Sequence, residues 1–252
     1  MNSALQRIVT FITQPLRLVR RYPVRSFLLP PTLGLVYVLA LIPSTPSIGD
    51  LRKAKSEVPS VLLASDGTVL AEYKRSNRQW VTLDKISPNV VNALIATEDR
   101  RFYEHHGIDF QRLAGAAFRT LTGDLQGGST ITQQLARNLY PEEIGRAASL
   151  NRKIKEAITA LKIESVYSKP EILEIYLNTV PFLYNAFGIE MAARTYFDKP
   201  AGKLDVLESA TLIGMIKGTS YYNPVQNPER ARNRRNTVLA QMVKHGKLDP
   251  AK

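Results

Sequence analysis

Glu98 lies in the first stretch whose residue types could do chemistry, residues 97–107: Thr-Glu-Asp-Arg-Arg-Phe-Tyr-Glu-His-His-Gly. Upstream, Ser87-Pro88 has the pattern of a helix start, and apolar residues follow it at helical spacing. This predicts that Glu98 sits late on a half-buried helix, where a partly desolvated carboxylate suits general acid–base catalysis. The alternative is a surface helix with a charged end, and these residues alone do not decide between the two.

A second stretch, residues 127–138, is rich in neutral polar side chains: Gly-Gly-Ser-Thr-Ile-Thr-Gln-Gln-Leu-Ala-Arg-Asn. Its polar residues fall on two neighbouring helix stripes, Thr130, Gln134 and Asn138 on one and Gln133 and Arg137 on the other. Such neutral donors and acceptors suit sugar hydroxyls and phosphate oxygens. A solvent-facing amphipathic helix is the alternative interpretation.

A third group, Arg152, Lys153 and Glu156, combines basic and acidic side chains about one helical turn apart. Positions four apart share a helix face, so Arg152 and Glu156 are expected to pair, and Lys155 adds charge on an adjacent face. Arginine binds phosphate through a bidentate fork, which suits a diphosphate ligand. The alternative is an ordinary surface ion pair, worth roughly 0.2–0.5 kcal/mol.

These stretches resemble, almost letter for letter, signature motifs of the peptidoglycan glycosyltransferases. The match continues in the same order through residues 169–178, then Leu207 to Leu212, and then Tyr222-Asn-Pro224. All five family motifs are thereby present across residues 85–240. One such motif could arise by chance, whereas five in sequence favour membership of this family.

The resemblance implies a mostly α, lysozyme-like bilobal helical domain that polymerises the cell-wall precursor lipid II. It implies a hexosyltransferase that forms β-1,4 linkages with inversion, releases undecaprenyl diphosphate and uses a divalent metal, Mg²⁺ or Mn²⁺, with no organic cofactor. Glu98 matches the family's general base. Glu156 matches its second carboxylate, close to the diphosphate with Arg152 and Lys153. Either glutamate is a possible metal ligand.

We expect substrate-binding roles for ten residues of these motifs: Asp99, Ser129, Thr130, Gln133, Gln134, Arg137, Asn138, Arg152, Lys153 and Lys155. For Asp99, a helix-terminal hydrogen bond is an open alternative to substrate binding. His105 matches the family's histidine, but a capping role fits it better. The loop after the fourth motif departs from the family, which has glycines at the positions of Leu183 and Asn185. Apolar residues within 108–128 are expected either to dip into the bilayer or to pack on the larger lobe.

Making a glycosidic bond from a lipid-linked sugar requires a base and positive charge. The diphosphate is already a good leaving group, so no strong general acid is needed there. A base takes the proton of the attacking hydroxyl, and cations neutralise the departing diphosphate. A lysozyme-like hydrolase also uses a glutamate, but it has no diphosphate for Arg152 and Lys153 to bind. A non-catalytic scaffold of the wall-synthesis machinery is a further alternative, against which intact Glu98 and Glu156 argue.

The net charge of +12 calls for an anionic partner such as nucleic acid, anionic lipid or a phosphorylated substrate. Given the resemblance, we expect lipid II, the growing glycan strand and membrane lipids as partners, and no nucleic acid. The chain has no cysteine, which excludes disulfides and thiolate metal sites.

Residues 1–26 form a basic tail with five arginines, and residues 27–43 carry no charge. Seventeen helical residues span roughly 25 Å, so we predict a single transmembrane anchor over 27–43. A signal peptide and a buried helix are the alternatives. The positive-inside rule places the tail in the cytoplasm. The linker 44–58 and the glycosyltransferase domain 59–252 then lie on the periplasmic side of the cell inner membrane.

The remaining pattern is one β-like stretch followed by helices. Residues 60–83 alternate around Asp66-Gly67 and predict one short hairpin or strand pair. Helices are expected over 88–104, 109–121, 129–139, 148–167, 169–178, 188–197, 204–217 and 227–244.

The β-like stretch resembles the linker that precedes this domain in bifunctional penicillin-binding proteins. The acyl-transferase motifs Ser-x-x-Lys and Lys-Thr-Gly do not occur in this sequence. The sequence therefore leaves open a monofunctional enzyme or a piece of a bifunctional one, and a transpeptidase partner or domain is a possible associate.

Overall fold

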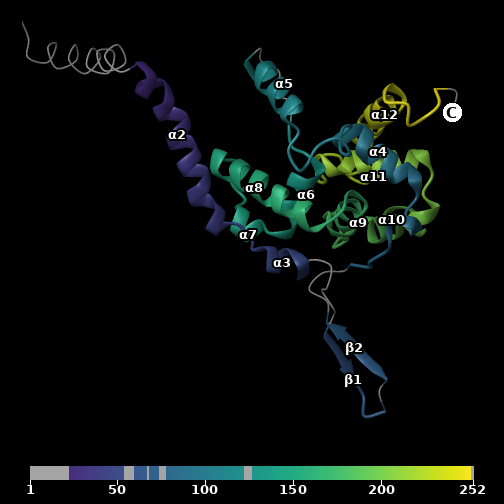
Figure 1. The fold of residues 1–252 in the computed structure, drawn as a ribbon. Coiled ribbons are helices and arrows are strands. Elements are labelled where there is room, and N and C mark those ends of the chain that lie inside the picture. Colours follow the sequence, from purple (N-terminus) through teal and green to yellow (C-terminus); the bar gives the residue numbers. More distant parts are fainter. Residues whose placement is uncertain (1–22, 54–59, 67, 74–77, 122–126, 251–252) are drawn as a thin grey trace, which may run out of the picture. The chain divides into compact units, whose positions relative to one another are not determined.

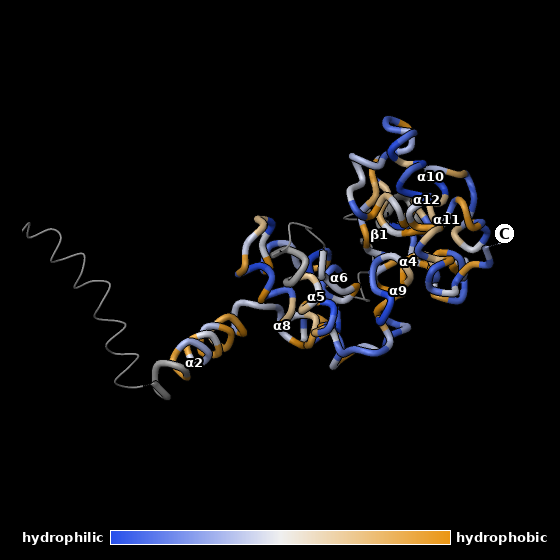
Figure 2. The backbone as a smooth tube through the Cα atoms, turned by 90° about the horizontal axis from the view of Figure 1, so that it is seen from above, coloured by the Kyte–Doolittle hydropathy of each residue, from blue (hydrophilic) through white to orange (hydrophobic). Residues whose placement is uncertain are grey.

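The structure, a computed structural model, describes residues 23–53, 60–66, 68–73, 78–121 and 127–250. The chain divides into two compact units, 1–45 and 46–252. In the first unit, α2 (Pro23–Leu41) leads into a 3₁₀ turn, η1 (Ile42–Ser44). Figure 2 shows apolar residues recurring along α2. Within the described ranges, no helix combines the length and apolar character needed to cross a membrane, and the anchor over 27–43 stays a prediction.

The second unit is helical apart from one hairpin, as the sequence predicts (Figure 1). Its first elements are α3 (Ile48–Lys53), β1 (Ser60–Leu63), β2 (Val69–Tyr73), η2 (Leu83–Lys85), α4 (Pro88–Glu98), α5 (Phe110–Leu121) and α6 (Ile131–Leu139). They are followed by α7 (Pro141–Ile144), α8 (Leu150–Val166), α9 (Lys169–Thr179), α10 (Ile189–Phe197), η3 (Ala201–Lys203), α11 (Val206–Ile216) and α12 (Pro228–Lys244).

Two groups of helices form the body of this unit. Helices α4, α11 and α12 pack on one another, and α6 packs on α8. Helix α9 contacts α6, α8 and α10, and α10 contacts α11, so α9 and α10 join the two groups. The short helix α3, within the segment predicted as a linker, packs on α8, and its Leu51 is fully buried.

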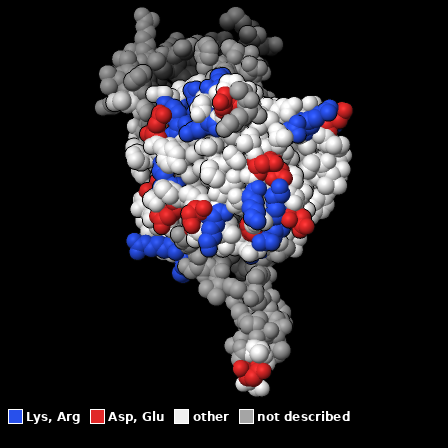
Figure 3. Space-filling model, turned by 90° about the vertical axis from the view of Figure 1, so that its right-hand side faces the viewer, with Lys and Arg blue, Asp and Glu red and all other residues white. Residues whose placement is uncertain are grey.

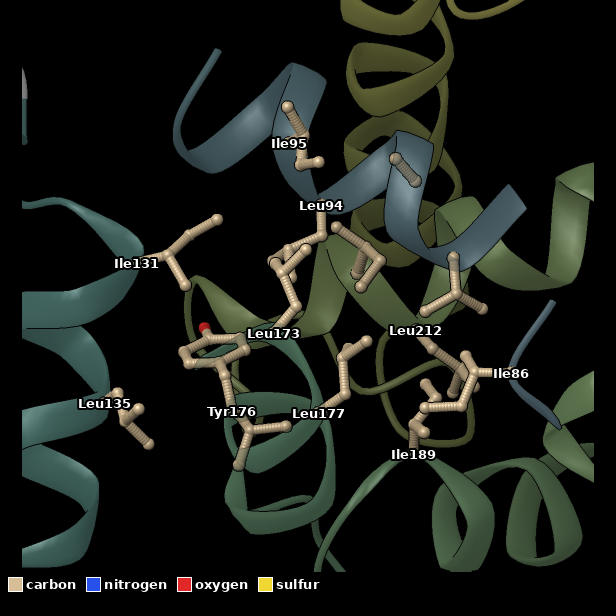
Figure 4. Packing of buried hydrophobic residues seen from close by; sticks show 14 of the residues in the cluster. Ile86, Leu94, Ile95, Ile131, Leu135, Leu173, Tyr176, Leu177, Ile189 and Leu212 are labelled. Carbon is tan, nitrogen blue, oxygen red and sulfur yellow. The ribbon is translucent and has the colours of Figure 1, made fainter. Parts of the chain in front are cut away.

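The core lies where these groups meet, and Figure 4 shows part of it. Leu94 from α4 and Leu212 from α11 belong to the same buried cluster as Leu173 and Tyr176 from α9. Tyr176 extends from α9 toward α6 and is fully buried. Its hydroxyl is a polar group inside an apolar core.

The predicted hairpin is present, but it ends earlier than the apolar pattern suggests. β1 and β2 pair antiparallel, and the Asp66 carboxylate caps the turn by accepting hydrogen bonds from Thr68. The apolar residues Trp80 and Val81, which follow β2, do not pair as a strand. They lie against α9. The backbone of Val81 exchanges hydrogen bonds with the Asn178 amide, and the Trp80 indole donates to Glu174. Side chains of α9 thus replace a neighbouring strand.

The predicted helix 88–104 is too long. α4 begins as expected, with Ser87 as its N-cap and Pro88 in its first turn, but it ends at Glu98. Asp99 leaves the helical conformation, with φ −158° and ψ 75°, because its carboxylate binds groups elsewhere in the chain. Glu98 is consequently the last helical residue, next to a turn that continues to Gly107.

The loop that departs from the family pattern is a tight turn. Tyr184 and Asn185 both have left-handed backbones, with φ of 59° and 58°, and the N–H of Ala186 donates to the carbonyl of Leu183. Asparagine tolerates this conformation better than most residues, so it can stand where the family has glycine. The Tyr184 hydroxyl accepts a hydrogen bond from Asn223, which holds the turn against the segment before α12.

Phe110 and Leu113, in the first half of α5, are exposed. They belong to the apolar set that was expected either to enter the bilayer or to pack on the larger lobe. Residues 122–126, which follow α5, lie outside the described part of the chain. Contact of the apolar residues within 108–128 with a bilayer stays a prediction.

Gly107 is predicted to tolerate no side chain. Its φ is +81°, and an added Cβ would lie 3.0 Å from the backbone carbon and oxygen of Ala160. We expect Gly107→Ala to lower the free energy of unfolding by more than the roughly 1–3 kcal/mol of left-handed strain alone. Gly145→Ala is the matched control, since Gly145 has φ +93° with no atom within 4 Å of the added Cβ. Urea unfolding that gave equal losses for both would contradict the clash with Ala160.

Candidate active site

The Glu98 side chain is 15% exposed at the end of α4. The amide nitrogen of Gln134 donates to one carboxylate oxygen at 3.0 Å. A guanidinium nitrogen of Arg234 lies 3.5 Å from the other oxygen. A carboxylate with one neutral donor, one cation at the limit of hydrogen bonding and some access to solvent can exchange a proton with a substrate hydroxyl.

Asp99, the neighbouring residue, is 1% exposed, and its side chain is enclosed by protein groups. Its carboxylate accepts from Nε2 of His105 at 3.0 Å and from the N–H of Ile131 at 3.0 Å. The second contact places a negative charge at the N-terminus of α6, where the helix dipole favours it. The helix-terminal alternative for Asp99 and the capping role for His105 therefore have direct partners in the structure.

Thr130 and Gln133 form the cap of α6. The Thr130 hydroxyl accepts from the N–H of Gln133, and the Gln133 side chain accepts from the N–H of Thr130, both at 3.1 Å. The Thr130 hydroxyl also donates to the carbonyl of Gly107 at 2.7 Å. These contacts fix the start of α6 against the turn that follows Glu98. Substrate-binding roles for the two residues stay predictions.

Glu156 is fully buried among three cations. Arg152 donates to one carboxylate oxygen, and the Lys153 ammonium donates to the other at 2.6 Å. Arg137 of α6 lies 3.7 Å from the same carboxylate, and Lys153 also donates to the Ser129 hydroxyl at 2.7 Å. The i,i+4 pairing of Arg152 with Glu156 is as the spacing predicts. We call Arg137, Arg152, Lys153 and Glu156 the basic cluster.

Helix α6 connects Glu98 to the basic cluster. It carries Gln134, which binds Glu98, and Arg137, which lies beside Glu156. Residues three apart on a helix are neighbours on one side, with Cβ atoms about 5–6 Å apart. The buried Tyr176 hydroxyl is affected by both charges: burial and the nearby Glu98 raise its pKa well above its ordinary value, and Arg137 opposes this rise. Glu98 and the basic cluster are therefore linked through α6.

Two predicted site residues lie apart from these contacts. The Lys155 ammonium donates to the carbonyl of Glu143 at 2.8 Å, on the side of α7. Asn138 is half-buried, and its side chain makes no hydrogen bond within the described ranges. Of the ten predicted substrate-binding residues, eight make contacts that hold α6, Glu98 or the basic cluster in place.

Three residues at the site were not predicted from the sequence. Arg234 reaches Glu98 from α12, and Arg112 donates to the backbone carbonyl of Glu98. The Tyr176 hydroxyl donates to the side-chain oxygen of Gln134 at 2.9 Å. The available sequence signal for Tyr176 is a tyrosine in place of a phenylalanine on an otherwise apolar helix face.

A cluster that could hold a metal includes Asp99, the neighbour of Glu98, but neither of the two predicted ligands. Ligand atoms of Asp99, His105 and Asp109 lie within 4.8 Å of one another, and all three residues are buried. Their carboxylates already accept hydrogen bonds. Burial acts to raise the pKa of Asp109, but hydrogen bonds from Arg101 and from the Arg112 backbone outweigh it and lower the pKa.

The carboxylates predicted as possible metal ligands have other neighbours. Both oxygens of Glu156 contact cations, and Glu98 faces Gln134 and Arg234. Cations beside a carboxylate oppose the binding of a divalent ion there. These residues as arranged do not fit a metal at Glu98 or Glu156, so no chemical step is assigned to one.

Charge elsewhere on the surface is mixed. On the face shown in Figure 3, basic and acidic side chains lie among one another instead of forming one patch of a single sign. A hollow at the end of α4 is lined by Arg100, Arg101, Glu104, His245 and Lys247 together with apolar atoms. Neither Glu98 nor Glu156 lines it, so the hollow is separate from the site that α6 organises.

The family described as Transglycosylase matches residues 66–243, which is more than half of the chain. The chain belongs to the transglycosylase family. This confirms the family predicted from the motifs, and both glutamates and the whole basic cluster fall inside the matched range.

Relatives of the chain are penicillin-binding proteins. It is 42% identical to penicillin-binding protein 1A of Escherichia coli (strain K12) over 206 residues, or 81% of this chain and 24% of that protein. It is 44% identical to penicillin-binding protein 2D of Bacillus subtilis (strain 168) over 196 residues, or 77% of this chain and 28% of that protein. This chain therefore spans about a quarter of the length of these two relatives.

Among solved structures, penicillin-binding protein 1A from Haemophilus influenzae aligns with 23% identity and a TM-score of 0.41. The alignment covers 77% of this chain and 19% of that one.

Proposed function

We propose that this transglycosylase-family chain is a peptidoglycan glycosyltransferase. It adds disaccharide units from lipid II to a growing glycan strand through β-1,4 linkages and releases undecaprenyl diphosphate. Glu98 is the general base, and the basic cluster binds the diphosphate. A transpeptidase partner or domain is part of the proposal only as a possible associate, because the relatives are about four times as long as the matched region.

The observation that carries the proposal is the contrast between two carboxylates linked by one helix. Glu98 is partly exposed and contacts a neutral amide, with a single guanidinium at 3.5 Å. Glu156 is fully buried and contacts three cations. A proton acceptor must be reachable by the substrate, whereas a carboxylate that only orients cations need not be. This contrast supports different roles for the two.

Glu98 acts at the sugar hydroxyl. It accepts the proton of the attacking hydroxyl as the glycosidic bond forms. The Gln134 amide donates to one oxygen of Glu98, which leaves the other oxygen, near Arg234, as the one that can turn toward substrate. Because the base is held from two sides, little reorganisation is needed when the hydroxyl arrives.

The basic cluster acts at the leaving group. Three cations and one carboxylate leave net positive charge, which stabilises the negative charge that develops on the departing diphosphate. Lys153 and Arg137 are 43% and 39% exposed, so they can contact a ligand while Glu156 keeps them in place. A divalent metal, which neither Glu98 nor Glu156 is arranged to hold, has no part in these steps.

The direct test supplies the purified protein with lipid II and measures product length and release of undecaprenyl diphosphate. The proposal expects products of many disaccharide units and one diphosphate released for each unit added. Absence of chain growth from lipid II would overturn it.

We also propose that the chain is anchored in the cell inner membrane, with its N-terminus in the cytoplasm and the catalytic domain in the periplasm. The arginine-rich segment 1–26 and the uncharged segment 27–43 support this orientation. A reporter enzyme that works only outside the cytoplasm is expected to be active when it is fused after Lys252. Activity of a strictly cytoplasmic reporter at that position would refute the orientation.

A further inference from the structure

The contacts around Glu98 form a chain of three side chains from three helices. The Tyr176 hydroxyl of α9 donates to Oε1 of Gln134 on α6 at 2.9 Å. Nε2 of the same amide donates to Glu98 at the end of α4 at 3.0 Å. Gln134 is 9% exposed and Tyr176 is fully buried, so water does not readily replace either contact.

The direction of these hydrogen bonds depends on the tyrosine. An amide side chain has an acceptor end and a donor end of nearly the same shape, and it can present either end to a neighbour. A carboxylate needs the donor end. Burial and the charge of Glu98 raise the pKa of Tyr176, so its hydroxyl keeps its proton and donates it to Oε1 of Gln134. If the amide turned over, this buried proton would lose its acceptor.

We propose that Tyr176 is a positioning residue for the base: it fixes the orientation of the Gln134 amide so that Nε2 always faces Glu98. This rests on the proposed role of Glu98 as general base. Tyr176 does not touch the substrate and acts only through Gln134. If the amide turned over, Oε1 would face the carboxylate, and two acceptors would repel each other in a buried site.

The test compares initial rates of lipid II polymerisation across pH for the wild type and Tyr176→Phe. The phenylalanine keeps the ring in the core and removes only the donor. We expect a rate about tenfold lower near neutral pH, because a hydrogen bond to a charged group is weakened. The acid limb of the profile should move to higher pH, since a carboxylate that loses a donor is protonated more readily. The KM for lipid II should change little.

Gln134→Met removes the intermediary and completes a double-mutant cycle. If Tyr176 acts only through Gln134, adding Tyr176→Phe to Gln134→Met should cause no further loss. Tyr196→Phe is the matched control, because the buried Tyr196 hydroxyl has no hydrogen-bond partner among the described residues. It should keep the wild-type rate and pH profile.

Three outcomes would overturn the positioning role: an unshifted acid limb in Tyr176→Phe, fully additive losses in the double variant, or an equal shift in Tyr196→Phe. A variant that is merely less stable would lose activity on heating without moving the limb. A wild-type protein that does not extend glycan would instead overturn the proposed function. Hydrogen exchange of the Tyr176 hydroxyl, followed by NMR, needs no substrate: it should be faster in Gln134→Met, and an unchanged rate would count against the contact.

Discussion

Replacing Glu98 with glutamine is expected to slow glycan-chain growth by about 10²–10⁴-fold, the typical cost of losing a general base. The amide has nearly the shape of the carboxylate, and its oxygen can still accept the hydrogen bond that Gln134 donates. What the variant loses is the ability to take a proton from the attacking hydroxyl. The measurement is the rate at which lipid II is converted to polymer by the Glu98→Gln protein.

Two comparisons make this result specific. Glu142→Gln changes an acid whose side chain is 77% exposed and pairs with the exposed Arg146, so the variant should polymerise at the wild-type rate. The melting temperature of Glu98→Gln should stay close to that of the wild type, because its carboxylate is only partly buried and the amide keeps the contact with Gln134. Polymerisation by Glu98→Gln at the wild-type rate would remove Glu98 from the role of base.

Local sequence signals predicted where the helices begin. Ser87-Pro88 and the Ser168–Glu171 capping box are complete within a few residues, and both mark helix starts in the structure. The end of α4 could not be predicted in this way. Asp99 leaves the helix to bind the N–H of Ile131, and nothing within one turn of Asp99 indicates that partner.

The same distinction holds at the site. The pairing of Arg152 with Glu156 follows from helical spacing alone and was predicted. The contact of Arg234 with Glu98 joins residues 136 positions apart, and that of Tyr176 with Gln134 joins residues 42 positions apart. Such contacts depend on how α4, α6, α9 and α12 pack, which periodicity does not specify. The motifs indicate which helices carry the site residues. The packing of those helices determines which side chains are in contact.

The basic cluster yields the prediction that separates a polymerase from a hydrolase. Arg152→Ala is expected to slow polymerisation of lipid II by about 10- to 100-fold, the cost of a charge-assisted hydrogen bond to phosphate. The variant should still fold, because Lys153 and Arg137 remain beside the buried Glu156. Arg152→Lys should recover only part of the rate, since an ammonium keeps the charge and lacks the bidentate fork.

Lys162→Ala is the matched control for Arg152→Ala. Lys162 lies on the same helix, α8, but its ammonium donates to the carbonyl of Pro46. Its removal should leave the polymerisation rate nearly unchanged. A phosphate-bearing substrate mimic that cannot polymerise should bind Arg152→Ala more weakly than the wild type. The difference should be larger at low salt, where charges are least screened.

The hydrolase alternative expects the opposite pattern from the same proteins. A hydrolase of finished glycan has no diphosphate to bind, so Arg152→Ala would keep nearly full activity. Product length on two substrates, lipid II and preformed glycan free of phosphate, decides between the two reactions. The basic cluster beside the Glu98 site leads us to expect chain growth from lipid II and no shortening of preformed glycan. If preformed glycan is shortened and lipid II is not extended, Glu98 serves bond cleavage, and the cations around Glu156 have only a structural role.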